Sequence, residues 1–137
     1  MGYTVYWSQS GQRKFSKEYV DDVKRLCKCA TENTAPIKLI LGDGCGENEP
    51  IITEELIALN GKGKQGYEGC VIDCRGASEF EFTKTARQDY DYFIKALLLL
   101  TAKYGYVYNI TCDDGYRDDS GPDFNIARKF LKENNFC

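Results

Sequence analysis

Apolar residues recur along the chain with two spacings, one typical of strands and one typical of helices. Alternating apolar and polar residues, or short apolar runs bounded by turn residues, predict strands. Such strands are expected at residues 3–7, 37–41, 51–59, 67–74, 80–83 and 106–112. The dipeptide Asn60-Gly61 follows the third strand and is a strong hairpin signal, so we expect a tight turn there.

Three other stretches carry the helical period. Residues 17–30 place their apolar side chains on one stripe, with Ser16 as the expected N-cap. Residues 85–88 match a capping box and predict the start of a long helix that Gly105 ends. A last helix is predicted after residues 120–123, with a buried face formed by Phe124, Ala127, Phe130 and Leu131.

The predicted order of elements is β-α-β-β-β-β-α-β-α, which indicates an α+β fold. We expect a single layer of mostly antiparallel sheet, with about five to six strands, covered by two to three helices. This is a decorated split βαβ (ferredoxin-like) layout. The chain has 137 residues and a mass of 15.6 kDa, close to the commonest size of one globular domain, so residues 1–137 are interpreted as a single domain.

The charge balance and the missing histidine restrict the possible functions. The chain has 18 Lys and Arg against 21 Asp and Glu, a net charge of -3, which argues against nucleic acid as a partner. It has no histidine, which excludes Ser/His and Cys/His nucleophilic pairs, histidine metal ligands and a histidine pH switch. Any enzyme would therefore depend on carboxylates, lysine and arginine.

The seven cysteines are odd in number and lack the C-x-x-C spacing of zinc sites. They are interpreted as reduced thiols, most of which pack in the core, with Cys70 and Cys74 on one strand face, and no metal or cofactor is expected. The chain start lacks the pattern of a secretory signal. The longest apolar run is far shorter than the roughly 20 residues of a membrane span. These features predict no membrane association and a cytoplasmic or nuclear location.

A first candidate site is an anion site where a strand is expected to pass into a helix. Lys84, Thr85 and Arg87 fall at this point, where the free N–H groups of a helix N-terminus and two cations would hold a phosphate or carboxylate. The alternative interpretation is that Thr85 only caps the helix, while Lys84 and Arg87 pair with Asp89 and Asp91 or face water.

A second candidate site is acidic and combines two loops. Asp43 lies in a glycine-rich turn, whereas Asp113 and Asp114 follow the last strand. The turn is not a phosphate loop, because Glu47 follows its last glycine where Lys-Ser/Thr is required. Paired carboxylates can do acid/base work or hold a metal that activates water, but an acidic turn and negative charge at a helix N-terminus are the commoner explanation of the second loop.

Strand aromatics form a third group. The predicted strands carry Tyr3, Tyr6, Trp7, Tyr104, Tyr106 and Tyr108 in or beside them. Single-strand RNA readers also stack bases on strand aromatics, but their sheets carry interleaved lysine and arginine. Residues 3–7 and 106–111 have neither, so core packing and protein contact are the favoured roles.

Three motifs are similar to those of a family of small uncharacterised proteins. They are Ile40-Leu41-Gly42-Asp43-Gly44 with Asn60-Gly61, then residues 80–91, and then Asp113-Asp114-Gly115. The middle motif resembles F-x-F-C-K-T-A-x-K-P-Y-D, with Thr83 here in place of the usual cysteine. The resemblance implies a shared fold and surface, adds no reaction, and indicates that this cysteine is not a required nucleophile.

Two functions follow as hypotheses. The first is a non-enzymatic protein-interaction or assembly module with a protein partner or a second copy as its ligand. The second is a small-ligand (phosphate or carboxylate) binder or metal-assisted hydrolase that uses Asp43, Asp113 and Asp114 with Lys84 and Arg87. We favour the first, because no catalytic constellation is evident.

Overall fold

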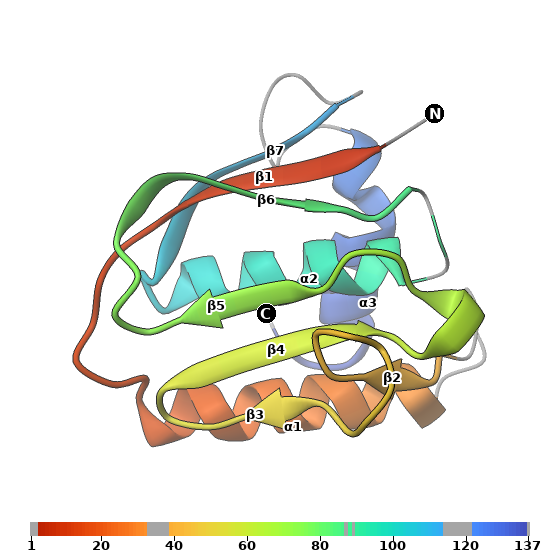
Figure 1. Cartoon of the computed structure of the whole chain (residues 1–137), viewed down its shortest axis with the longest axis horizontal. Coiled ribbons are helices and arrows are strands. Elements are labelled where there is room, and N and C mark those ends of the chain that lie inside the picture. The colour runs from red at the N-terminus through yellow and green to blue at the C-terminus, as the bar shows by residue number, and fades with distance from the viewer. Residues whose placement is uncertain (1–2, 33–38, 87, 89, 114–121, 137) are drawn as a thin grey trace.

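The computed structural model describes residues 3–32, 39–86, 88, 90–113 and 122–136. Within these ranges it contains seven strands, three α-helices and two short 3₁₀ helices (Figure 1). In chain order they are β1 (Thr4–Gln9), α1 (Lys17–Glu32), β2 (Leu41–Gly42), β3 (Ile51–Ile52), β4 (Leu56–Gly61), η1 (Gly63–Gln65), β5 (Cys70–Asp73), β6 (Ser78–Lys84), α2 (Asp91–Lys103), β7 (Val107–Cys112), η2 (Pro122–Phe124) and α3 (Asn125–Glu133). The predicted α+β class is confirmed.

The strands form two sheets, whereas the sequence predicts one. One sheet has the order β6-β1-β7, and the other has β4 between β5 on one edge and β2 and β3 on the other. All of the pairs are antiparallel. β5 and β6 are consecutive but separate, because β6 pairs with β1; the Glu68 N–H to Lys84 C=O bond (3.1 Å) still links the two sheets at one end.

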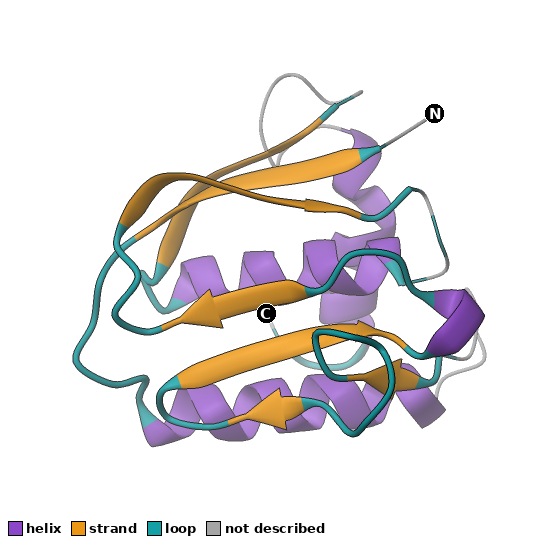
Figure 2. Ribbon diagram, in the orientation of Figure 1, coloured by secondary structure: helices purple, strands orange, loops and turns teal. Residues whose placement is uncertain are grey.

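The three helices lie on one side of the strands, behind them in the view of Figure 2. Helix α1 carries its buried residues on one stripe, and the Ser16 hydroxyl accepts the Tyr19 N–H (3.2 Å), so the predicted N-cap is confirmed. Helix α2 is buried on almost every side, which explains its run of leucines. The predicted face of the last helix is also confirmed, with all four of its apolar residues buried.

The Asn60-Gly61 turn is a wrong prediction, because both residues end β4 and pair with β2. The Asn60 side chain is buried and donates to the carbonyls of Gly44 (3.2 Å) and Tyr67 (3.1 Å), which fixes it inside the sheet. A Cβ on Gly61 would lie 2.3 Å from the Gln65 carbonyl oxygen, so glycine is needed here for close approach and not for a turn. The actual turn in the predicted strand 51–59 lies between β3 and β4.

Candidate functional site

An exposed group of aromatic side chains covers the outer face of the β6-β1-β7 sheet. Phe80, Phe82 and Tyr108 are 62%, 47% and 45% exposed, and Tyr6 is half-buried between the flanking strands. The ring centroid of Phe80 lies 5.7 Å from that of Tyr6 and 5.8 Å from that of Phe82, so the rings are in contact. We call these four residues the aromatic face.

Alternation along β1 explains which aromatics point outward. Tyr3, Val5 and Trp7 are buried in the core, so Tyr6 and Ser8 between and beyond them face the other side. Tyr6 pairs with Phe82 of β6, which therefore shares its face. The six predicted strand aromatics thus do not share one face, because Tyr3 and Trp7 are buried in the core.

A β-bulge turns Tyr108 outward, although the alternation in the sequence predicts that it faces the core. Tyr6 pairs with Thr111 and Ser8 pairs with Tyr108, which leaves two residues of β7 opposite one residue of β1. Asn109 has a φ of 54° at this point. The extra residue reverses the alternation, so Ile110 stays buried while Tyr108 is exposed.

A second bulge lies across β1, and the two bulges flank a hollow. The β1 and β6 pairs shift between Trp7 and Gln9, so Glu79 and Phe80 together oppose Ser8. The Ser8 hydroxyl donates to the Glu79 carbonyl (2.8 Å). The hollow has a volume of about 290 Å³ and is lined by Tyr6, Trp7, Ser8, Glu79, Phe80, Asn109 and Thr111. Bulges often re-aim side chains beside functional sites.

Asp113 fixes the position of Tyr6 on the aromatic face. Its carboxylate accepts the Tyr6 hydroxyl (2.5 Å) and the Thr4 backbone N–H (3.0 Å). The hydrogen bond to the carboxylate raises the pKa of Tyr6 above its ordinary value of 10, because an ionised Tyr6 would place two negative charges together. Tyr6 therefore presents a neutral, oriented ring.

The structure describes two of the three residues of the predicted anion site. Lys84 is exposed at the end of β6, Thr85 is buried, and Arg87 lies outside the described residues. Helix α2 begins at Asp91 and not at Thr85, and the Thr85 hydroxyl donates to the Asp91 carboxylate. The capping box is thus a wrong prediction, since the Thr85 side chain bonds a carboxylate instead of a backbone N–H of the helix.

Sequence reasoning missed a buried ion pair next to Thr85. Lys95 Nζ lies 2.8 Å from Asp91 Oδ2 and donates to the Tyr3 hydroxyl (2.9 Å) and the Asp123 carbonyl (3.1 Å). Only 6% of the Lys95 side chain is exposed. The i,i+4 spacing of Asp91 and Lys95 was the available signal. This network connects α2 to Tyr3, which immediately precedes β1, and to η2.

The acidic candidates lie on different sheets. Asp43 follows β2, and its carboxylate accepts the backbone N–H groups of Cys45 (3.1 Å) and Glu47 (3.3 Å), which lowers its pKa. Asp113 follows β7, whereas Asp114 lies outside the described residues. Lys84 and Asp113 both flank Thr4, from β6 and from the end of β7, so the structure brings these two to the same end of one sheet.

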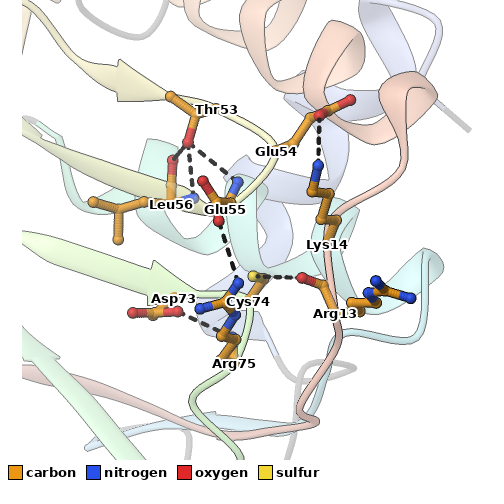
Figure 3. A network of polar contacts seen from close by, with 9 residues as sticks. All are labelled: Arg13, Lys14, Thr53, Glu54, Glu55, Leu56, Asp73, Cys74 and Arg75. Atoms are coloured by element: carbon orange, nitrogen blue, oxygen red, sulfur yellow. Dashed lines mark hydrogen bonds and ion pairs between the residues drawn. The ribbon is translucent and has the colours of Figure 1, made fainter.

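Another group of polar contacts fixes the turn before β4 and the turn after β5, which lie side by side because the two strands are antiparallel (Figure 3). The Thr53 hydroxyl accepts the N–H groups of Glu55 (3.2 Å) and Leu56 (2.9 Å). Arg75 pairs with Glu55 at 3.5 Å, and both side chains are exposed. A hollow of about 420 Å³ lies here, but its one cation is already paired, and exposed pairs of this kind contribute about 0–1 kcal/mol.

The cysteines of the core behave as the sequence predicts. Cys70 and Cys74 are buried on one face with Ile72, and burial raises the pKa of Cys70 to about 12. Cys45 is exposed. In the described part of the chain, no three or more cysteine or acidic side chains are grouped so that they could hold a metal ion.

Comparison of the chain with protein-family models, with curated proteins and with solved structures finds no match. The resemblance in three short motifs therefore assigns no family. Within the described ranges, none of the helices has the length and apolar character needed to cross a bilayer.

Proposed function

We propose that this protein is a non-enzymatic interaction module that docks a protein partner on the aromatic face. The observation that carries the proposal is the contact between the rings of Tyr6, Phe80 and Phe82 on a sheet face where Phe80, Phe82 and Tyr108 are exposed. Contiguous exposed apolar patches are rare on proteins that act alone. Aromatic residues are enriched, and acidic residues and lysine depleted, at the centres of protein interfaces.

The energetics of such docking are favourable because the rings are held on paired strands. Full burial of an exposed Phe contributes about 1.5–3 kcal/mol, and Phe80 and Phe82 are each about half exposed or more. Tyr6 is already oriented by Asp113, so little side-chain entropy is lost on binding. A face of this kind supports a specific complex without movement of the backbone.

The second hypothesis, a ligand binder or metal-assisted hydrolase, is supported only by the position of Lys84 and Asp113 at the same end of one sheet. It requires Asp43 and Asp113 to share a concave site with Lys84. The carboxylate of Asp43 is instead bonded to its own loop, and that of Asp113 to β1. We therefore adopt the interaction module.

Site-specific photo-crosslinking in the source cells tests this proposal. The photoreactive residue p-benzoylphenylalanine replaces Phe82 or Tyr108 on the aromatic face, or Ile126 as the control. Ile126 is matched, because it is 56% exposed and apolar but lies on α3. We expect the same discrete protein adduct from both face positions and none from Ile126. The absence of adducts at the face, or the same adduct from Ile126, would refute the proposal.

A further inference from the structure

We propose that the segment docked on the aromatic face is basic and inserts an arginine side chain into the hollow beside Glu79. This inference rests on the proposed function and specifies the chemistry of the partner. It follows from the shape of the hollow, from the groups that line it and from the charge of the sheet around it.

The hollow suits a single long side chain. Its volume of about 290 Å³ is at the lower limit of small-molecule pockets, which occupy about 300–1,000 Å³. It opens where the two bulges interrupt the pairing on both sides of β1, at Trp7 to Gln9 and at Tyr6 to Ser8. A side chain entering from a docked segment would therefore meet the sheet at its least regular point.

The residues that line the hollow include aromatic residues and one acidic residue, Glu79, which is exposed. Tyr6 and Phe80 supply the rings, and Glu79 supplies the only ionisable group besides the Tyr6 phenol. A guanidinium stacks on an aromatic ring and at the same time forms planar hydrogen bonds with a carboxylate. Ser8, Asn109 and Thr111 add polar side chains suited to hydrogen bonding with the remaining N–H groups.

The surrounding charge favours a basic partner over a second copy of this chain. Around the aromatic face the charged residues are Glu79 and Lys84 of β6 and Asp113, which follows β7, whereas Glu81 pairs with buried Trp7 and faces the other side of the sheet. Acids thus outnumber bases around the aromatic face. A symmetric pair of copies would bring these like charges together, whereas a basic segment would neutralise them.

The test is a nuclear magnetic resonance titration of the full chain with two matched peptides. The probe is acetyl-Gly-Arg-Ile-Arg-Gly-amide, and its twin carries citrulline, which has the same shape without the charge, at both arginine positions. We expect the arginine peptide to shift the amide signals of Tyr6, Ser8, Phe80 and Thr111 in a saturable way. Its affinity should exceed that of the citrulline twin about fivefold and should fall as salt is added.

Two charge-matched variants locate the effect. Glu79→Gln should weaken binding of the arginine peptide about fivefold, whereas Glu133→Gln removes the same charge from exposed α3 and should change it less than twofold. Equal affinity for the two peptides, equal effects of the two variants, or signal shifts spread over other surfaces would overturn the inference. If the inference fails in this way, photo-crosslinks from positions 82 and 108 to another protein would still support the proposed function. A crosslink to a second copy of this chain would overturn the basic partner but not the role of the face in docking.

Discussion

Replacing Lys95 with methionine probes the buried ion pair whose network connects α2 to Tyr3 and to η2. The change keeps a long apolar side chain and removes the ammonium group that contacts Asp91, the Tyr3 hydroxyl and the Asp123 carbonyl. Removal of one partner from a buried pair costs about 3–5 kcal/mol, because the other charge is left without compensation. The Asp91 side chain is 17% exposed and keeps its bond from Thr85, so we expect the lower end, about 3 kcal/mol.

Thermal and urea unfolding measure this loss. For a chain of this length, about 3 kcal/mol lowers Tm by roughly 10 °C. Lys24→Met on the exposed side of α1 is the matched control and should change stability by less than about 0.5 kcal/mol. In a double-mutant cycle with Asp91→Asn, the sum of the stability losses of the two single variants should exceed the stability loss of the double variant by about 2 kcal/mol. A Lys95→Met loss as small as that of the control, or additive losses in the cycle, would refute the assigned role.

Three further predictions concern the thiols, the tyrosines and one glycine. Iodoacetamide should modify exposed Cys45 in the folded protein but Cys70 only after unfolding, since Cys70 is buried and its pKa is raised to about 12; peptide mass mapping showing equal rates would contradict this. Burial raises the pKa of Tyr19, so its contribution to stability is fully present below pH 10 and is lost as the pH rises further, because the phenol of the unfolded chain releases its proton first. The urea concentration at the unfolding midpoint should therefore decrease when the pH is raised from 9.5 to 11.5, a range about the ordinary tyrosine pKa, and an unchanged midpoint would be inconsistent with this. Gly66→Ala should cost about 1–3 kcal/mol in urea unfolding, because the new Cβ would lie 2.1 Å from the Gly61 carbonyl oxygen, and an unchanged midpoint would show that the backbone moves apart freely.

The spacing of apolar residues and the capping residues predicted correctly those elements whose ends are fixed by hydrogen bonds between near neighbours in the sequence. Helix α1 follows from its apolar stripe and from Ser16, whose hydroxyl bonds the first turn as the sequence suggests. The start of α2 was not predicted correctly, because the Thr85 hydroxyl donates to the Asp91 carboxylate, which also belongs to the buried ion pair. Its capping pattern was satisfied in sequence but overridden by tertiary contacts.

The aromatic face was only partly predictable for a related reason. Alternation assigned β1, β6 and β7 as strands, and it placed Phe80 and Phe82 on one face of β6. It did not indicate that this face points to solvent. The bulge at Asn109 reverses Tyr108, and no period-2 pattern contains that information. The hollow beside Glu79 depends on the same two bulges and therefore could not be read from residue spacing.

The size of the native assembly tests the central claim most directly. In extracts of the source cells, the protein should migrate in a complex heavier than the 15.6 kDa of one chain. A variant with Phe80, Phe82 and Tyr108 changed to serine should stay folded, with Tm lowered by no more than about 10 °C because each ring is only about half buried, and should migrate as the single chain. Ile126→Ser should leave the complex intact. Migration of the unchanged protein as a single chain, or an equally large complex for the triple variant, would contradict the account.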